Sequence, residues 1–372
     1  MERLKTEYRG FTLYNAGLPD FPRNFTRDSI ISSILSRNSK MLENQLNFCT
    51  YEQGANKNPK NGEEPGKIIH EYPAVDLNRV STKFSACDTT ALFLVGHKFY
   101  IDLTGDKSLA DCQQKSMENA IKYILSHLNQ DNLFMEDPKF CDGKKFATKT
   151  TYWKDSEIID RKNGEPSYPI CYLLAHVQNM CGMRCAAKIL NSKYFRVAEK
   201  MKKGVEKLFN RESDNFYIAI DKKGPIEAVS SDFLHMLFYL EPGDLKNKQL
   251  EEIIESSKKI ETVLGYRTLE PELLRKTKSE YHTKTVWPFE QAIINSGAMK
   301  HRLWAERCGF MSLAKSLRRV EEISSRVASK LDTDPEIFIL GNPGIEKGGC
   351  DPQLWTIAAK KYFNKFKGHK FI

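Results

Sequence analysis

The sequence predicts an all-α fold, a closed toroid of helical hairpins whose long loops gather at one end. Apolar residues recur at helical spacing through most of the chain. Several of the helical segments are joined by short turns, and long polar segments separate the resulting pairs. Because function concentrates in loops, we expect the site at the loop end.

The expected helices follow from the period of the apolar residues. In chain order they cover residues 27–35, 88–103, 109–128, 170–190, 194–209, 231–240, 250–263, 286–303, 304–331 and 353–366. A short strand is expected at 216–220, where β-branched and aromatic residues gather.

Turn residues mark the ends of these helices, since Gly, Pro, Asn and Asp interrupt helical periodicity. They occur at 104–106, 191–192 and 241–244. The long polar segments are 53–79, 129–152, 265–285 and 332–349. The stretch 56–67 resembles a linker in composition, but what precedes it is too short for an independent core. We therefore expect an insertion at the mouth of the toroid and a single domain spanning residues 1–372.

Composition bounds the class of protein. The chain has 372 residues, 40% hydrophobic and 28% charged, which suffices for a large core. No run approaches the roughly 18 apolar residues of a membrane span, and residues 1–5 lack the apolar core of a signal peptide. Nine cysteines without a Cys-x-x-Cys pair fit reduced thiols. We expect a cytoplasmic protein with no membrane partner, no metal and no cofactor.

The net charge of +9 raises the question of a nucleic-acid partner. The lysines lie along helical faces such as 200–207 and 251–259, where they alternate with glutamates. We interpret them as solvated surface and expect no nucleic-acid partner.

The most informative motif is Tyr152-Trp153-Lys154-Asp155-Ser156, which places one carboxyl beside an indole and an ammonium. A carboxyl held against aromatic surface stays protonated near neutral pH and donates a proton, as a glycosidase general acid does. For an isolated match, a solvated turn with Asp155 or Ser156 as a helix cap is the more frequent explanation.

The segment 25–29 places Arg27 and Asp28 side by side at an expected helix start. Such a pair holds sugar hydroxyls by charged hydrogen bonds. A helix cap beside a surface arginine is the alternative. Asp88, at the start of the next long helix, has the same two interpretations.

Further candidate side chains lie in later polar segments: Arg267, Tyr281, His282, Trp287 and Glu336. Aromatic and hydrogen-bonding groups at this density suit the flat apolar face and hydroxyl rim of a pyranose. A core aromatic cluster is the alternative for Trp287. Glu336 places a carboxylate in a polar loop shortly before the last helix.

In order and wording, the motifs resemble the amylo-alpha-1,6-glucosidase domain of glycogen debranching enzymes, within the six-hairpin (α/α)6 toroid group that includes glucoamylases and trehalases. The motifs are Phe25-Thr26-Arg27-Asp28, Asp88-Thr89-Thr90-Ala91-Leu92-Phe93-Leu94, Trp153-Lys154-Asp155-Ser156, Gly265-Tyr266-Arg267-Thr268-Leu269, Tyr281-His282 with Thr285-Val286-Trp287-Pro288, Pro335-Glu336-Ile337-Phe338 and Cys350-Asp351-Pro352-Gln353-Leu354-Trp355. They cover nearly the whole chain. Tyr152 and Lys284 stand where family members have glycine.

The resemblance implies a carbohydrate substrate and hydrolysis of an alpha-glucosidic bond with inversion. It implies that Asp155 is the general acid and Glu336 the general base, with Arg27 and Asp28 as a clamp on the terminal glucose. The other substrate-binding residues that it implies are Asp88, Trp153, Lys154, Arg267, Tyr281, His282 and Trp287. We expect Lys154 to point away from Asp155, because a nearby cation lowers the pKa of a carboxyl.

Alternatives remain open at this stage. Glu290 is a rival base, and Glu157 and Asp160 are rival acids, although helical or surface roles are expected for all three. From other classes, a glycan-binding toroid without turnover and a nucleic-acid-binding helical solenoid remain. The sequence leaves open the linkage, the aglycone, the chain length of the substrate and the oligomeric state.

Overall fold

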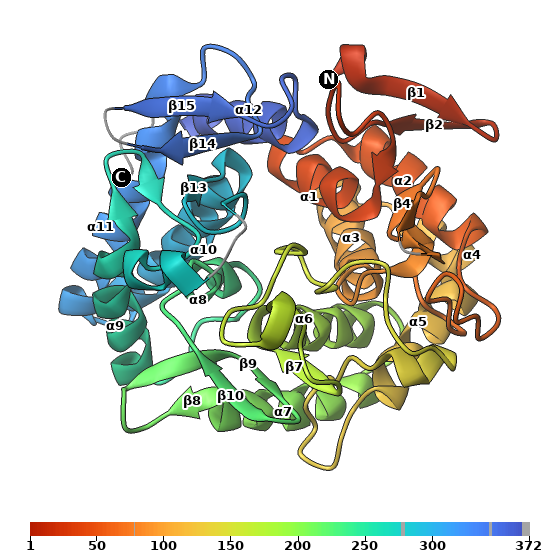
Figure 1. The fold of residues 1–372 in the computed structure, drawn as a ribbon, viewed down its shortest axis with the longest axis horizontal. Coiled ribbons are helices and arrows are strands. Elements are labelled where there is room, and N and C mark those ends of the chain that lie inside the picture. Colours follow the sequence, from red (N-terminus) through yellow and green to blue (C-terminus); the bar gives the residue numbers. More distant parts are fainter. Residues whose placement is uncertain (78, 277–279, 342–343, 367–372) are drawn as a thin grey trace.

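The computed structural model describes residues 1–77, 79–276, 280–341 and 344–366, and its helices form two concentric rings (Figure 1). The inner ring consists of α1 (Thr26–Ser36), α3 (Thr89–Thr104), α6 (Leu173–Ile189), α8 (Asp232–His235), α10 (Pro288–Arg307) and α12 (Leu354–Phe366). The outer ring consists of α2 (Ser39–Tyr51), α5 (Gln114–Ser126), α7 (Lys193–Val205), α9 (Asn247–Ser256) and α11 (Met311–Ser325), with α4 (Ser108–Cys112) between α3 and α5. The expected all-α toroid is confirmed.

Contacts between neighbouring inner helices close the ring. Helix α1 packs on α3, α3 on α6, α6 on α8, α8 on α10, α10 on α12, and α12 on α1. Inner helices are covered on most sides, so α3 buries consecutive residues such as Leu92, Phe93 and Leu94. Outer helices bury one face only, as in α7, which buries Ala198 and Met201. This difference follows from the width of the apolar stripe on each helix.

Short turns join α1 to α2, α3 to α4, α6 to α7 and α10 to α11 at one end of the ring. Helix α1 ends at Arg37 with φ of 53°, and α3 ends at Gly105 with φ of 74°. Between α10 and α11 the chain passes through Gly309, with φ of 78°. A left-handed residue ends a helix by allowing its last carbonyls to be satisfied. The long polar segments connect the hairpins at the other end.

The N-terminal ends of the inner helices meet at the loop end. Arg27, in the first turn of α1, bonds to Asp88, the residue before α3. Trp287, the residue before α10, packs edge-on against Trp355 of α12. Because the N-terminus of a helix carries partial positive charge, this end of the ring suits acidic side chains.

Short strands brace the loops. One sheet is formed by β13 (Thr285–Val286), β14 (Ile337–Leu340) and β15 (Ile345–Gly348), in that order. A second contains β7 (Ile170–Tyr172), β8 (Phe209–Asn210), β9 (Asn215–Asp221) and β10 (Gly224–Glu227), and the first hairpin is β1 (Lys5–Tyr8) with β2 (Phe11–Tyr14). Two-residue pairs are β3 (Asn24–Phe25) with β4 (Glu71–Tyr72), β5 (Asp76–Leu77) with β6 (Val80–Ser81), and β11 (Glu261–Thr262) with β12 (Gly265–Tyr266). The pairing of Val286 with Phe338 brings the 281–287 segment beside Glu336.

Buried apolar side chains form one large cluster that runs through both rings. A small second cluster of Leu4, Met41 and Leu354 ties the N-terminal residues to α2 and α12. None of the described helices is both long enough and apolar enough to cross a membrane.

Most expected elements are present, including the strand at 216–220, which lies within β9. Helix α2 was not predicted, although its N-cap Asn38 and its buried Leu42 and Leu46 follow a helical pattern. Residues 78, 277–279 and 342–343, which fall in three of the expected polar segments, lie outside the described residues.

Several predicted boundaries were wrong. The helix expected from residue 170 begins at Leu173, because 170–172 pair with β9 as strand β7. The helix expected over 109–128 divides at Gln113 into α4 and α5. The break expected between residues 303 and 304 lies instead near Gly309, and Val286 belongs to β13. Cross-strand pairing and one left-handed glycine overrode the local period in these places.

Candidate active site

A cavity of about 80 Å³ lies at the loop end, where the inner helices begin. Its lining residues come from segments along most of the chain: Ala16, Phe21, Phe25, Arg27, Asp28, Trp153, Asp155, Tyr281, His282, Trp287, Glu336, Gln353 and Trp355. The cavity therefore brings together all of the sequence-predicted site residues except Asp88, Lys154 and Arg267.

Glu336 is held as a hydrogen-bond acceptor. It is 1% exposed and immediately precedes β14. Its Oε1 accepts hydrogen bonds from the Tyr281 hydroxyl at 2.6 Å and from Nε2 of Gln353 at 2.8 Å. Its Oε2 accepts the backbone N–H of Cys350 at 3.0 Å. Burial raises the pKa of Glu336, while these three donors act in the opposite direction by stabilising the carboxylate.

The Tyr281 hydroxyl keeps its proton in this arrangement. Burial and the neighbouring Glu336 carboxylate raise the pKa of Tyr281. The hydroxyl of Thr285 fixes the Tyr281 segment by donating to the Tyr281 backbone carbonyl at 2.7 Å. Tyr281 is thus a donor to Glu336 at neutral pH, which favours the ionised form of that carboxyl.

Gly349 leaves the space in which the Glu336 side chain lies. It has φ of 69°, in the left-handed region that favours glycine. A Cβ at this position would lie 2.2 Å from Oε2 of Glu336 and 2.7 Å from its Cβ. The turn after β15 therefore needs glycine both for its backbone conformation and for the position of the carboxylate.

Asp155 lies in a loop before α6, with part of its surface open to the cavity. Burial raises the pKa of Asp155 from 3.8 to about 6. The Arg27 guanidinium opposes this rise, and the carboxylates of Glu71 and Asp88 add to it. Asp155 thus holds a proton at higher pH than an ordinary aspartate, as a general acid requires.

Aromatic rings form the walls of the cavity. His282 stacks on Trp287 with ring centroids 5.1 Å apart, and Trp153 meets Trp287 edge-on at 5.7 Å. Nδ1 of His282 lies 2.6 Å from the Ser156 hydroxyl, and burial lowers the pKa of this histidine well below its usual value. The aromatic part of the wall is therefore uncharged and largely apolar beside the two carboxyls.

Arg27 forms a bidentate pair with Asp88 rather than with Asp28. Its Nε and Nη2 lie 2.8 and 3.0 Å from the two Asp88 oxygens. Both partners are buried, which fixes the guanidinium at the cavity wall. Arg27 is therefore held by Asp88, and the expected clamp of Arg27 and Asp28 on a sugar stays a prediction. Asp28 lies in the cavity, and burial raises its pKa well above the usual value.

Lys154 does not line the cavity. Its ammonium lies 3.1 Å from Oδ1 of Asp232 and donates to the hydroxyls of Ser230 and Ser231 and to the carbonyl of Thr268. As expected, it is directed away from Asp155. Lys154 is therefore not among the residues that line this cavity, and its expected contact with a substrate stays a prediction.

Asp88 and Arg267 also lie outside the cavity lining. Asp88 is fully buried and supports Arg27, so any effect on a ligand passes through that guanidinium. Arg267 is half-buried, and burial lowers its pKa. Tyr152, which stands where family members have glycine, is stacked on Tyr172 at 4.7 Å.

The rival carboxyls lie elsewhere. Glu290 is fully buried in the first turn of α10, where Oε1 accepts the Ser231 hydroxyl at 2.6 Å. Glu157 pairs with Lys149 at 2.8 Å. Asp160 lines a different cavity. None of the three lines the cavity that holds Asp155 and Glu336.

Sequence reasoning missed several lining residues. Gln353 is the clearest, since it contacts Glu336 directly, and it lies in the last of the resembling motifs. Phe21 and Phe25 are partly exposed aromatic rings on the cavity wall, 5.9 Å apart. Trp355 completes the wall by stacking on Phe289 at 3.9 Å. The signal in the sequence was the presence of Phe25, Gln353 and Trp355 in the first and last resembling motifs.

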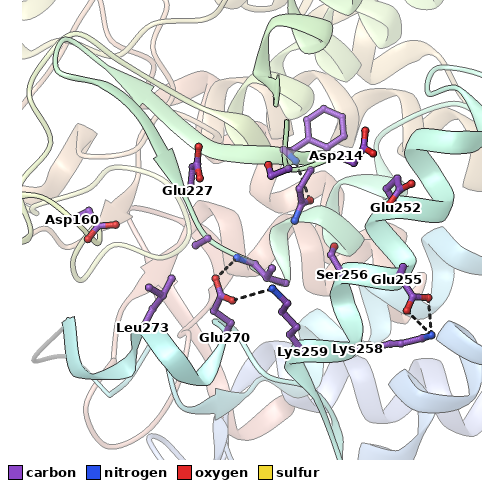
Figure 2. A pocket seen from close by; sticks show the side chains of 15 residues that line it. Asp160, Asp214, Glu227, Glu252, Glu255, Ser256, Lys258, Lys259, Glu270 and Leu273 are labelled. Atoms are coloured by element: carbon purple, nitrogen blue, oxygen red, sulfur yellow. Dashed lines mark hydrogen bonds and ion pairs between the residues drawn. The ribbon is translucent and has the colours of Figure 1, made fainter. Parts of the chain in front are cut away.

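A larger cavity of about 710 Å³ lies between the β9–β10 hairpin and α9 (Figure 2). Acidic side chains dominate its lining, and its two lysines are paired: Lys258 with Glu255 at 2.6 Å and Lys259 with Glu270 at 3.9 Å. It contains neither Asp155 nor Glu336. We therefore place the candidate active site in the smaller cavity, on its chemistry rather than its size.

No protein-family model matches this chain, and no curated protein matches it in sequence. Solved structures of similar fold include a GH63 mannosylglycerate hydrolase from Thermus thermophilus in complex with Tris and D-glycerate. It has a TM-score of 0.67 and 11% identity over 98% of this chain and 97% of that chain. Neutral trehalase from Saccharomyces cerevisiae has a TM-score of 0.63 and 10% identity over 97% and 76%. Glucoamylase from Saccharomycopsis fibuligera has a TM-score of 0.61 and 12% identity over 96% and 89%. The chain thus has the six-hairpin (α/α)6 toroid fold.

Proposed function

We propose that this protein is a glycoside hydrolase that cleaves an alpha-glycosidic bond with inversion, with Asp155 as general acid and Glu336 as general base. One observation carries the proposal. The cavity contains one carboxyl whose pKa is raised to about 6 and one carboxyl that accepts three hydrogen bonds. Two carboxyls in different environments are what acid and base roles on opposite sides of a glycosidic bond require.

In the proposed reaction, Asp155 protonates the leaving oxygen while Glu336 removes a proton from a water on the opposite face of the sugar. Tyr281 and Gln353 orient the Glu336 carboxylate by donating to the same oxygen, Oε1. That leaves Oε2, which accepts a single backbone N–H, as the oxygen with remaining capacity for the water. An inverting geometry requires roughly 6.5 to 9.5 Å between the two carboxyl groups.

The cavity of about 80 Å³ is too small for the interior of a polymer, and we propose that a terminal sugar ring binds at its mouth. Aromatic walls suit the apolar face of that ring, and Asp28 suits its hydroxyl rim. Three solved structures that share the fold are named as a mannosylglycerate hydrolase, a trehalase and a glucoamylase. Each of these names describes an enzyme that acts on a glycoside. Within this class, the resembling motifs favour an alpha-glucoside of the glycogen debranching type as the first substrate to test.

We further propose a single catalytic domain in a reducing compartment such as the cytoplasm. All nine cysteines are free thiols, among them the exposed Cys112 and Cys308. Free exposed thiols are typical of proteins that remain in a reducing environment.

The test of the proposed function is incubation with a panel of alpha-linked oligosaccharides and identification of the products. Release of a monosaccharide by the parent protein, and its loss in Asp155→Asn and Glu336→Gln, is the expected result. Binding of the same oligosaccharides without any product would contradict hydrolysis and leave a glycan-binding toroid.

Asp28→Asn tests the proposed contact with the terminal sugar. Asp28 lies in the cavity beside both catalytic carboxyls, so its loss should lower kcat/KM by about tenfold, equivalent to one hydrogen bond to a sugar hydroxyl. The fold should be unaffected, because Arg27 is held by Asp88. Steady-state kinetics together with a melting curve provide the measurement. A stably folded variant with the parent's kinetics would remove Asp28 from substrate binding.

A further inference from the structure

The three residues before Asp155 converge on one buried carboxylate. Asp232 is the first residue of α8 and is 1% exposed. Its Oδ1 accepts the indole N–H of Trp153 at 2.8 Å and lies 3.1 Å from Nζ of Lys154. Its Oδ2 accepts the hydroxyl of Tyr152 at 3.4 Å. The side chain of Asp232, at the start of inner helix α8, therefore anchors the loop that presents Asp155.

The same contacts determine the direction of the Lys154 ammonium. Besides Asp232, its partners are the hydroxyls of Ser230 and Ser231 at 2.7 and 3.1 Å and the carbonyl of Thr268 at 3.0 Å. A buried ammonium needs compensation of this kind, because removing one partner leaves an uncompensated charge. Its charge still reaches the cavity, since Lys154 contributes, after burial, to the lowered pKa of His282.

A metal ion is the other possible centre of this cluster, because Asp232, His235 and Glu290 bring their ligand atoms within 4.8 Å of one another. The ammonium of Lys154, 3.1 Å from Oδ1, already supplies a cation there. Oδ2 of Asp232 also accepts the Ser230 hydroxyl at 3.0 Å, so both oxygens are engaged. We interpret the cluster as a charge-compensated network built around Lys154.

We propose that Asp232 is a positioning residue for the general acid: it fixes Trp153 at the cavity wall and holds the Lys154 ammonium away from Asp155, so that Asp155 faces the leaving oxygen with its proton. The inference rests on the proposed function, in which Asp155 donates that proton. Asp232 itself does not line the cavity and touches neither substrate nor water in this scheme.

Other charged groups also act on Asp155. They are Arg27, which lowers its pKa, Glu71 and Asp88, which raise it, and the cavity residues Asp28 and Tyr281. Replacing Asp232 changes none of these side chains. A change in the titration of Asp155 in an Asp232 variant is therefore attributable to Lys154 or to the position of the loop.

The test is Asp232→Asn, which preserves the size of the side chain and removes the charge that compensates Lys154. The main readout is the ratio of kcat on an alpha-glucoside with an unactivated sugar or alkyl leaving group to kcat on alpha-glucosyl fluoride. Only the unactivated leaving group depends strongly on protonation by Asp155. We expect this ratio to fall by at least about tenfold. An unchanged ratio in a folded Asp232→Asn protein would overturn the inference.

The pH profile separates the two roles of Asp232. If the ammonium of Lys154 acts on Asp155 once it is uncompensated, the alkaline limb of kcat/KM moves to lower pH, because a cation favours the ionised acid. We expect a shift of roughly half a pH unit or more, and its reversal in the double variant Asp232→Asn with Lys154→Met. A lowered ratio without a shift assigns the effect to the anchoring of Trp153 alone.

Two further variants control the experiment. Glu321→Gln removes a buried carboxylate of the outer helix α11, which pairs with Arg302 of α10. This variant should lower stability and leave the leaving-group ratio unchanged. If Asp232→Asn does not fold, Trp153→Phe removes the indole N–H that Asp232 accepts, together with part of the ring at the cavity wall. It should lower the ratio in the same direction, and the parent's ratio in that variant would contradict the inference.

Failure of this inference is distinguishable from failure of the proposed function. If Asp155→Asn lowers the ratio and Asp232→Asn does not, Asp155 remains the acid and the positioning role of Asp232 is wrong. If Asp155→Asn has the parent's ratio, or the parent protein hydrolyses no glycoside, both are wrong.

Discussion

At the scale of residues, two carboxyls of similar chemistry are given different properties by their neighbours. Asp155 lines the cavity together with the indole of Trp153, and burial raises its pKa to about 6 although the charge of Arg27 opposes the rise. Glu336 accepts hydrogen bonds from a phenol, an amide and a backbone N–H. Burial thus raises the pKa of both carboxyls, and the three donors around Glu336 oppose the rise by stabilising its ionised form.

The pH dependence follows from these two environments. Activity requires protonated Asp155, so it should be lost as pH rises through the pKa of this group, about 6 in the free enzyme. It also requires ionised Glu336, so it should be lost as pH falls through the pKa of that group. The measurement is kcat/KM against pH, which should be bell-shaped with its alkaline limb near pH 6. An alkaline limb that stays in place in Asp155→Asn would assign it to another group.

Gly349→Ala tests the position of the base. The added Cβ would collide with Glu336, 2.2 Å from Oε2, so the carboxylate must move. We expect kcat to fall by roughly a hundredfold with little change in KM, because displacement of a catalytic group by about an ångström has that effect.

The control for this variant is Gly105→Ala. Gly105 has φ of 74°, similar to that of Gly349, and no atom within 4 Å of an added Cβ. Both variants should lose about 1 kcal/mol of stability from the left-handed backbone. Only Gly349→Ala should lose activity, and equal kcat values for the two variants would contradict the role of Gly349.

At the scale of elements, the inner helices of the hairpins carry the site, and the outer helices contribute to stability. Each inner helix begins at the cavity end and each outer helix packs behind it, so changes in an outer helix should affect folding and leave the site intact. Helix α2 is the informative case because the apolar period alone did not predict it. Its start depends on the Asn38 side chain, which accepts the backbone N–H of Met41 at 3.1 Å.

Asn38→Ala tests whether a change in an outer helix lowers stability without affecting the active site. Loss of the N-cap should lower the free energy of unfolding by about 1 kcal/mol, because one N-terminal N–H loses its partner. Asn38→Asp retains an acceptor and should remain close to the parent. Thermal or denaturant unfolding measures the difference, and kcat/KM of both variants should equal that of the parent. A loss of activity in the folded Asn38→Ala protein would mean that outer helices contribute to the site.

At the scale of the whole molecule, the cavity depends on closure of the ring. Phe25 to Asp28 lie near one end of the chain and Glu336 to Trp355 near the other, and the contact of α12 with α1 brings them together. The helical period and the turn residues predicted the toroid, because each hairpin is a local pattern. The motifs predicted most of the cavity lining, because those residues lie in loops and at helix starts that the closed ring gathers at one end.

The features of the fold and of the site that were not predicted depend on contacts between distant segments, which no local sequence pattern contains. The direction of Lys154 is set by Ser230, Ser231 and Asp232, far along the chain. The partner of Arg27 is Asp88 rather than its neighbour Asp28 for the same reason. Strand β7 forms at the start of an apparently helical segment because β9 is available to pair with it.

The central claim is that Asp155 and Glu336 act on opposite faces of an alpha-glycosidic bond, and the anomer of the first product tests it most directly. Proton NMR spectra recorded during the first minutes of hydrolysis distinguish the two anomers before mutarotation mixes them. Direct attack of a water held by Glu336 predicts that the beta anomer appears first. An initial alpha anomer would contradict the inverting assignment of these two carboxyls.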